Sequence, residues 1–340
     1  MRNKNITVFG AYGHTGRFVV AELFKRGWTP ILAGRDEAKL KVTGNAYTGS
    51  EVRIASIDDP ASLDRALDGA AAVINCAGPF LDTAAPLIEA ALRARIHYLD
   101  VTAEQMAAFS VFEQYADAAR DADIVIAPAM AFYGGLGDLM ATATMGDWTS
   151  ADQISIAIAL DSWKPTKGTR LTGERNTARR VVLSKYKLEF LADPPSTRSW
   201  DFPAPFGTQD VVELPLTEMI TISRHLQVPE IRSYMNLTPL TDLRDPNTPE
   251  PTAADESGRS EQAFLMDVVV TKGEEARRKT AYGRDIYAIT APIVAEAVER
   301  ILDGRIKRTG VAAGGEIFDA EDFLQKLSAS HISFGRSKVN

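Results

Sequence analysis

Three glycines near the N-terminus are spaced so that they could hold the phosphates of a dinucleotide. Gly10, Gly13 and Gly16 form G-x-x-G-x-x-G in "VFGAYGHTGRFVV", between a short apolar run and a segment with helical spacing. In such a turn the first glycine permits a tight bend, the second lets the pyrophosphate approach the backbone, and the third lets helix and strand pack closely. The free N–H groups at the start of the helix would then face the phosphates. The alternative is a tight turn without a ligand. The residues of this turn that we expect at the cofactor are Gly10, Tyr12, Gly13, His14, Thr15, Gly16 and Arg17.

The next predicted strand ends in Gly-Arg rather than in an acid. Sites that prefer NAD usually place Asp or Glu there to bind the ribose 2′-hydroxyl, whereas NADP sites place an arginine near the 2′-phosphate. Gly34 and Arg35 occupy this point, and Asp36 follows them. Arg17 adds a second positive charge on the same rim, and an arginine offers a planar fork to phosphate. NADP is favoured, although Arg35 could be a solvent-facing residue and Asp36 leaves some use of NAD open.

The stretch "INCAGPF", residues 74–80, closes the fourth predicted strand with a turn of small residues. In a doubly wound sheet this turn faces the ribose and the nicotinamide. Cys76 could be a reactive thiol, but a free cysteine in an apolar strand end is more often a small packed residue. The further residues expected at the cofactor are Asp58, Cys76, Ala77, Gly78 and Pro79.

Candidate catalytic residues follow the last strand of the first half. Hydride transfer from a nicotinamide needs geometry and a proton donor. In "AFYGGLGDL", Tyr133 could donate a proton and Asp138 could orient a substrate amine. The alternatives are packing for Tyr133 and a helix N-cap for Asp138. Thr102 and Glu104 also lie on the ligand-facing edge, where they could instead mark a helix start.

Other kinds of site find little support. No tyrosine has a lysine four positions later, which excludes the mechanism of the short-chain dehydrogenases. The four histidines are scattered, so no catalytic metal is expected. Lys164, Lys167 and Arg170 could meet an acidic substrate, or they could lie in a solvated loop.

The order of the predicted elements indicates an α/β fold. Strands and helices alternate through the first half, which is typical of a parallel, doubly wound Rossmann sheet covered on both faces. After residue 130 the alternation is irregular, and residues 238–262 are rich in Pro, Asp, Glu and Ser, which predicts an exposed mobile loop. We expect a dinucleotide-binding domain at 1–130, completed by C-terminal helices at 285–330. Residues 131–284 would form an α+β substrate and dimerisation domain on a mixed sheet.

Charge and cysteine content restrict the partners. The chain of 340 residues has a net charge of −7 and a pI of about 5.3, which argues against nucleic acid and anionic membranes as partners. Its only cysteine excludes an internal disulfide. The N-terminus contains no apolar stretch long enough for a signal peptide or a membrane span. A cytoplasmic location is therefore expected.

Five motifs together resemble one family. "GAYGHTGR", "AGRDEAKL", "NCAGPF", "HYLDVTAE" and "AFYGGLGDL" occur in the order and spacing of the saccharopine-dehydrogenase-like oxidoreductases, which include saccharopine reductases and trans-acting enoyl reductases. The resemblance implies a Rossmann domain that binds NADP, a substrate domain on a mixed sheet, and a homodimer. Ala103 and the segment "GGLGD" depart from the family pattern where substrate contacts are expected, so the substrate is not carried over.

These observations predict an NADP-dependent oxidoreductase. The expected reaction is reduction of a C=N or an activated C=C bond in a small metabolite, and fold does not decide between the two. The alternative is a non-catalytic protein that binds NADP(H) as a redox sensor.

Overall fold

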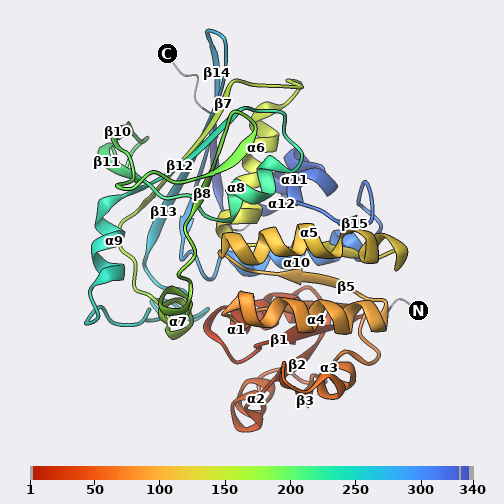
Figure 1. Ribbon diagram of the computed structural model, residues 1–340. Coiled ribbons are helices and arrows are strands. Elements are labelled where there is room, and N and C mark those ends of the chain that lie inside the picture. Colours follow the sequence, from red (N-terminus) through yellow and green to blue (C-terminus); the bar gives the residue numbers. More distant parts are fainter. Residues whose placement is uncertain (1–2, 329–330, 337–340) are drawn as a thin grey trace.

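The computed structural model describes residues 3–328 and 331–336, and a seven-stranded parallel sheet organises the N-terminal part (Figure 1). The strand order is β15-β6-β5-β4-β1-β2-β3, and every pair in it is parallel. The strands are β1 (Asn5–Phe9), β2 (Thr29–Gly34), β3 (Glu51–Ile54), β4 (Ala72–Asn75), β5 (His97–Asp100), β6 (Val125–Ala127) and β15 (Gly310–Val311). The order reverses between β1 and β4, so a crevice opens at the carboxyl ends of these two strands.

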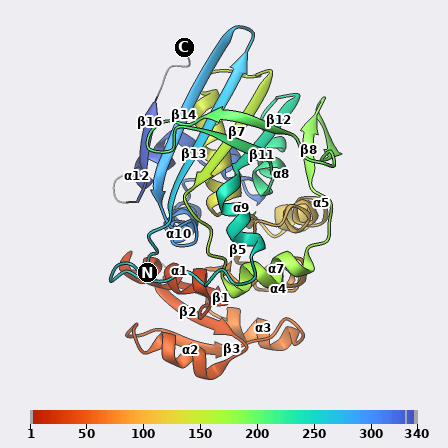
Figure 2. The same ribbon diagram turned by 90° about the vertical axis from the view of Figure 1, so that its left-hand side faces the viewer.

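Helices cover both faces of this sheet, as the alternating pattern predicts. They are α1 (His14–Lys25), α2 (Glu37–Gly44), α3 (Pro60–Leu67), α4 (Phe80–Ala94), α5 (Gln105–Asp121) and α10 (Thr290–Leu302). Figure 2 shows α1 and α10 on one side of the sheet and α4 and α5 on the other. Local signals start the helices: the Asp59 carboxylate accepts from the Ser62 N–H at 3.2 Å, and Pro60 follows at the first helical position.

A second, mixed sheet carries the rest of the chain. Its order is β10-β11-β12-β7-β13-β14-β16, and the β8–β9 hairpin is attached to β12. The strands are β7 (Gln153–Leu160), β8 (Val181–Ser184), β9 (Lys187–Phe190), β10 (Thr197–Asp201), β11 (Thr208–Glu213), β12 (Glu230–Asn236), β13 (Ala263–Lys272), β14 (Glu275–Arg284) and β16 (Ser333–Arg336). Only β7 and β12 pair in parallel; their neighbours are antiparallel. The predicted fold class, a Rossmann sheet plus a mixed-sheet domain, is confirmed.

Short helices pack around the second sheet. They are the π-helix η1 (Phe132–Leu136), α6 (Gly137–Met145), α7 (Lys167–Arg175), α8 (Thr217–Ser223), α9 (Leu237–Arg244), α11 (Gly314–Ile317) and α12 (Ala320–Ser328). α6 lies against β13 and β14, and Met266 and Val268 of β13 are fully buried. α7 is different: none of its residues is buried, and it lies beyond the end of β7, beside the first sheet (Figure 1).

The C-terminal segment is shared between the two sheets. α10 packs on α1 and β15 joins β6, but α11 and α12 pack on α6, and β16 pairs with β14. The expectation that all of residues 285–330 completes the Rossmann domain therefore needs correction, because the amphipathic α12 buries its apolar side against the second domain. Residues 329–330 of that expected segment, and 1–2 of the first domain, lie outside the described residues.

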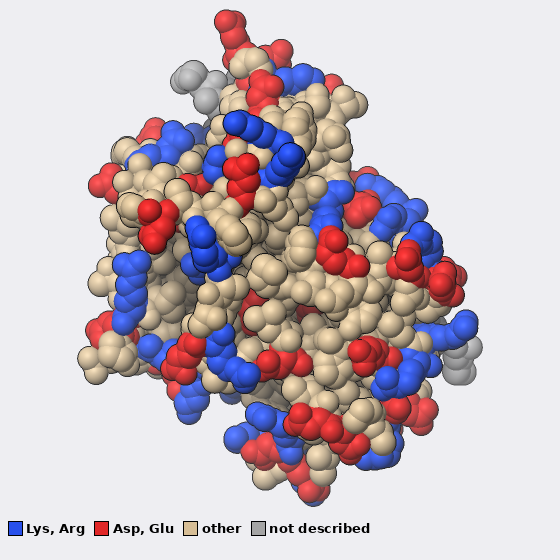
Figure 3. Space-filling model, viewed as in Figure 1, with Lys and Arg blue, Asp and Glu red and all other residues tan. Residues whose placement is uncertain are grey.

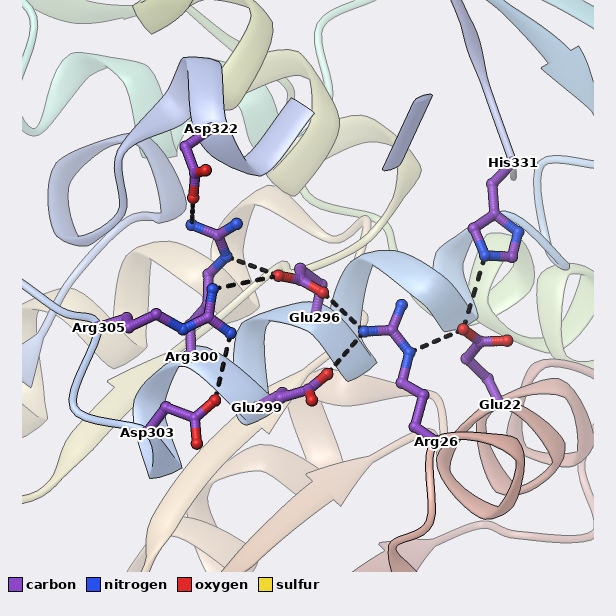
Figure 4. A network of polar contacts seen from close by, with 9 residues as sticks. All are labelled: Glu22, Arg26, Glu296, Glu299, Arg300, Asp303, Arg305, Asp322 and His331. Atoms are coloured by element: carbon purple, nitrogen blue, oxygen red, sulfur yellow. Dashed lines mark hydrogen bonds and ion pairs between the residues drawn. The ribbon is translucent and has the colours of Figure 1, made fainter. Parts of the chain in front are cut away.

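An ionic network fastens α10 to α1 (Figure 4). The Arg26 guanidinium of α1 donates to Glu22 at 2.8 Å, to Glu296 at 2.7 Å and to Glu299 at 2.9 Å. Glu296 is fully buried and also accepts from Arg300 at 2.8 Å. The N-terminal helix and a helix almost 270 residues later are thereby held together.

The exposed loop that composition predicts for residues 238–262 is found over most of the segment, because residues 244–257 are largely exposed. Part of it is helical, in α9, and part lies on α1, because a Cβ on Gly258 would sit 3.6 Å from the Phe18 ring. Asp255 also approaches Arg284 of β14 at 3.6 Å. Polar residues of this segment, such as Asp255, contact neighbouring elements as well as solvent.

Candidate cofactor and substrate site

The three glycines of the first turn are required by three different contacts. Gly10 adopts φ +82°, and a Cβ there would lie 2.9 Å from the Ala77 Cβ at the end of β4. A Cβ on Gly16 would lie 2.2 Å from the Gly10 carbonyl oxygen, which no real side chain permits. A Cβ on Gly13 meets only that same oxygen, at 3.1 Å, and otherwise faces open space. Gly10 therefore permits the tight turn, and Gly16 permits close packing of the helix on the strand. Gly13 leaves the approach to the backbone open.

The start of α1 is a built anion site. The helix begins at His14 with no side-chain cap, and Gly13 accepts only from the Arg17 N–H. Among the residues that the structure describes, no acceptor takes the N–H groups of His14, Thr15 and Gly16. Free amides and the positive end of a helix dipole favour a phosphate at this place. The turn therefore fits the pyrophosphate of a dinucleotide.

The end of β2 carries the features that distinguish the two nicotinamide cofactors. A Cβ on Gly34 would lie 2.8 Å from the Tyr12 ring, so Tyr12 lies across the strand end. Arg35 is exposed there. Asp36 accepts from the Lys39 N–H and pairs with the Lys39 ammonium, both at 3.0 Å. Its carboxylate caps α2, which leaves it engaged rather than free to bind a ribose hydroxyl.

The turn after β4 is braced from below. The Asn75 side chain accepts from the Ala77 N–H at 3.0 Å and donates to Thr83 and to the Tyr98 hydroxyl. Burial raises the pKa of the Cys76 thiol, so it stays protonated and unreactive, as its strand-end position suggests. A Cβ on Gly78 would lie 3.1 Å from the Thr172 hydroxyl, which shows that α7 lies directly over this turn.

Polar residues after β5 hold the sheet edge together. Asp100 accepts from the N–H groups of Ala129 and Thr102, at 2.8 and 3.0 Å, and burial raises its pKa to about 6. Glu104 accepts from the N–H groups of Phe80 and Leu81 at 2.8 and 3.1 Å. Glu104 therefore caps α4, a helix that begins 24 residues earlier, so its place in the sequence does not reveal this role. The Thr102 hydroxyl accepts from the Glu104 N–H.

Tyr133 lies in an aromatic cluster between the two sheets. Its side chain is 7% exposed, and its hydroxyl has no hydrogen-bond partner among residues 3–328 and 331–336. Its ring lies 6.3 Å from Trp163, whose Nε1 donates to the Tyr287 hydroxyl at 2.9 Å. The Tyr287 ring lies 5.3 Å from His14 of the glycine turn. The cluster connects the cofactor turn to η1, and burial raises the pKa of Tyr133 well above its ordinary value.

Sequence reasoning did not find Trp163 or Tyr287. They lie 30 and 154 residues from Tyr133, in segments with no motif of their own. Only the return of the chain after β14 brings Tyr287 beside His14. A cleft built from such distant segments has no local signal.

The structure corrects the expectation for Asp138. This residue is fully buried, with one carboxylate oxygen 2.6 Å from the His225 Nε2 and the other accepting from the Gly315 N–H at 2.8 Å. It fastens α6 to the segment after α8 and to α11. A buried carboxylate needs such partners, and here they leave no oxygen free for a substrate amine.

The three cations after β7 have different surroundings. Lys167 pairs with Glu250 at 3.5 Å, and Arg170 donates to the Thr248 carbonyl at 2.8 Å. Lys164 lines a polar groove of about 330 Å³, together with Asp161, Glu261 and Tyr287. Of the three, Lys164 is the one placed to meet a solute. The remaining predicted cofactor residue, Asp58, is exposed after β3, with its carboxylate 3.4 Å from the Ser56 hydroxyl.

Comparison with known proteins agrees with this site. Residues 6–126 match the saccharopine dehydrogenase NADP-binding domain family. A saccharopine dehydrogenase-like oxidoreductase of Bos taurus is 29% identical over 146 residues, which is 38% of this chain and 34% of the relative. A probable mitochondrial saccharopine dehydrogenase-like oxidoreductase of Arabidopsis thaliana is 26% identical over 207 residues, covering 56% of this chain and 44% of the relative.

A solved structure has the same fold along nearly the whole chain. Apo saccharopine dehydrogenase (L-Glu forming) from Saccharomyces cerevisiae superposes with a TM-score of 0.67 at 13% identity, over 98% of this chain and 100% of that one. At this identity the likeness concerns the fold.

Residues 6–126 of the chain match the NADP-binding domain of the saccharopine dehydrogenases, and the rest of the chain shares their fold. The family match supports NADP as the cofactor, in agreement with the turn and with Arg35. The matched part is 34% of the length of the Bos taurus relative and 44% of the length of the Arabidopsis thaliana relative.

The expected cytoplasmic location is contradicted by the relatives. The Arabidopsis relative is named as mitochondrial, and a Caenorhabditis elegans relative, 26% identical over 141 residues, is named a lipid droplet localized protein. A single cysteine prevents an internal disulfide in any compartment, so it never distinguished among them. Within the described residues, no helix combines the length and the apolar content that a membrane span needs.

Proposed function

We propose that the protein is an NADP-dependent oxidoreductase that reduces a C=N or an activated C=C bond of a small metabolite. The observation that carries this proposal is the Tyr133 hydroxyl, which is buried and lacks a hydrogen-bond partner among the described residues. A buried hydroxyl without a partner costs free energy unless a ligand or water satisfies it. Its position, one aromatic ring away from Tyr287 and two from His14, is suited to a substrate lying over the nicotinamide.

Tyr133 would supply the proton that reduction requires. NADPH, when bound, supplies a hydride, and the substrate atom next to the reduced carbon then needs a proton. Because burial raises the pKa of Tyr133, its phenol stays neutral and holds that proton until a strong base accepts it. A nascent amine nitrogen or a carbanion is such a base. The Trp163–Tyr287–Thr169 hydrogen bonds, at 2.9 Å each, keep the surrounding walls in place.

The substrate would enter beside α7. Side chains of this helix contact both domains: Thr169 reaches Tyr287, and Arg175 pairs with Asp82 at 2.9 Å. The groove that Lys164 lines opens next to Tyr287, and its mixed charges favour a polar metabolite. The homodimer that the family resemblance implies remains part of the proposal.

The test is NADPH oxidation against a panel of imines, oxo acids with amines, and enoyl compounds. We expect turnover with at least one member. Tyr133→Phe should lower that turnover about a hundredfold and leave NADPH affinity unchanged, because it removes the proton and keeps the ring. Tyr186→Phe, at an exposed tyrosine between β8 and β9, is the matched control and should have no effect.

The same samples distinguish an enzyme from a redox sensor. A sensor would oxidise NADPH with no member of the panel, and its assembly state would differ between NADPH and NADP in light scattering. That pair of results would overturn the catalytic proposal while keeping the cofactor. Undiminished turnover in Tyr133→Phe would instead reject Tyr133 as the proton donor.

A further inference from the structure

A pocket of about 310 Å³ lies at the carboxyl ends of β2 and β3. Arg35 enters it from the end of β2, and Ile54 and Ser56 form the side at β3. Ser62 and Arg65 reach it from α3, on the opposite face of the sheet. In a doubly wound fold this is the end of the crevice that receives the adenosine half of a dinucleotide.

Two arginines from different elements line this pocket without strong partners. Arg35 has no carboxylate within ion-pair distance among the described residues. The Arg65 side chain is 69% exposed, and its one such neighbour is Asp59 at 3.7 Å. Asp59 is already the N-cap of α3, accepting from the Ser62 N–H. Both guanidinium groups are thus available to an anion.

The third side of the pocket is apolar. Ile54 ends an edge strand with 51% of its surface exposed, which makes it one of the most exposed large aliphatic side chains of the described chain. A planar base laid against it would remove that surface from water. An apolar side next to two guanidinium groups fits a nucleoside that carries a phosphate.

We propose that Arg65 of α3 and Arg35 of β2 together clamp the 2′-phosphate of NADP, so that Arg65 is a second determinant of cofactor specificity. This inference rests on the proposed use of NADP. It also replaces Arg17, the second cation expected from the sequence, because Arg17 does not line the pocket. The charge of Arg17 acts on His14 and on Tyr47, neither of which lines the pocket.

The acids near the pocket explain why one arginine is not enough. Asp58 and Asp59 follow β3 directly, and a 2′-phosphate would bring about two further negative charges beside them. Asp59 itself lines the pocket, and Arg65 is its ion-pair neighbour at 3.7 Å, so Arg65 offsets the repulsion as well as binding the phosphate. Removing it should therefore weaken NADPH binding by at least as much as the loss of one phosphate contact.

The experiment measures dissociation constants of NADPH, NADH, 2′,5′-ADP and 5′-AMP by calorimetry. Arg65→Ala and Arg35→Ala should each weaken NADPH and 2′,5′-ADP at least tenfold, and NADH and 5′-AMP less than threefold. Arg65→Lys keeps the charge but loses the fork, so it should recover only part of the affinity. Arg93→Ala is the matched control, because this exposed arginine of α4 pairs with Asp64 of α3 and lies outside the pocket.

The outcomes separate the inference from the function on which it rests. If Arg65→Ala keeps the unmutated ratio of NADPH to NADH affinity while Arg35→Ala loses it, Arg65 plays no part in specificity. If Arg17→Ala removes the preference for NADPH over NADH and Arg65→Ala keeps it, the assignment of Arg17 from the sequence is right and that of Arg65 is wrong. If the unmutated protein binds NADPH no better than NADH, the NADP assignment itself fails. Melting curves of all variants check that the fold is kept.

Discussion

At the scale of single residues, the turn separates cofactor binding from folding. A methyl group on Gly13 would meet only the Gly10 oxygen at 3.1 Å, whereas one on Gly16 would meet it at 2.2 Å. Gly13→Ala should therefore keep the fold and lower NADPH affinity at least tenfold, because the methyl group occupies the phosphate approach. Gly16→Ala should instead destabilise the protein, because α1 must move away from β1. NADPH fluorescence and thermal melts measure both effects, and normal binding by a well-folded Gly13→Ala protein would reject the turn as the phosphate site.

The sequence predicts residue roles well where one local motif determines them. The glycine spacing and Arg35 are read directly from 26 consecutive positions, and their geometry agrees with that reading. Prediction from the sequence fails where a residue's partner is remote along the chain. Nothing near Asp138 indicates that His225 and Gly315 will surround it. Arg65 was likewise hidden, since its role depends on which helix passes the end of β2.

At the scale of elements, α1 and α10 depend on a shared ionic network. Arg26 is the only described residue that bonds to Glu22, Glu296 and Glu299 at once. Arg26→Met should lower the free energy of unfolding by about 3 kcal/mol, because it leaves the fully buried Glu296 with fewer partners. Lys41→Met, which removes an exposed pair with Glu37, should cost less than about 1 kcal/mol. Urea titrations give both values, and equal effects would contradict the importance of burial.

The same network predicts sensitivity to acid. Burial alone would raise the pKa of Glu22, but hydrogen bonds from His331 and Arg26 outweigh it and hold the pKa at about 2. A carboxylate with a lowered pKa adds stability above its unfolded value of about 4.3, and this stability is lost as the pH falls towards 2. Glu22→Gln should therefore flatten the fall in unfolding free energy between pH 5 and pH 2. An unchanged slope would show that Glu22 titrates normally.

The Asp138–His225 pair gives the opposite dependence on pH. Burial opposes the charge on His225, but the Asp138 carboxylate outweighs it and raises the pKa of His225. A histidine with a raised pKa adds stability that is complete below its unfolded pKa of about 6.5 and is lost as the pH rises through the folded value. The unmutated protein should thus lose stability relative to the Asp138→Asn/His225→Gln double variant as the pH rises above about 6.5. Parallel curves for the two proteins would show that the pair makes no pH-dependent contribution.

At the scale of the whole molecule, the two sheets share the C-terminal segment, and charges of both signs are mixed on the face that Figure 3 draws. Figure 3 shows Lys and Arg interspersed with Asp and Glu over the face drawn, among the residues that are coloured. The alternation of the first half predicted the parallel sheet, but the sequence gives no sign that β15, two residues long, would extend it or that β16 would return to β14. Such crossings of the C-terminal segment from one sheet to the other depend on long-range packing. The local periodicity of the sequence does not indicate them.

These crossings predict that the molecule unfolds as one unit. α10 joins the first sheet while α11, α12 and β16 join the second, so neither part can unfold without releasing the C-terminal segment of the other. NADPH at a hundred times its dissociation constant should then stabilise the whole protein by about 2.7 kcal/mol, although it binds the first sheet. Trp28 reports on the first domain and Trp200 on the second, so single-tryptophan variants can follow each. We expect one coincident transition for both, shifted equally by NADPH; a transition at Trp200 that ignores the cofactor would show that the two domains unfold independently.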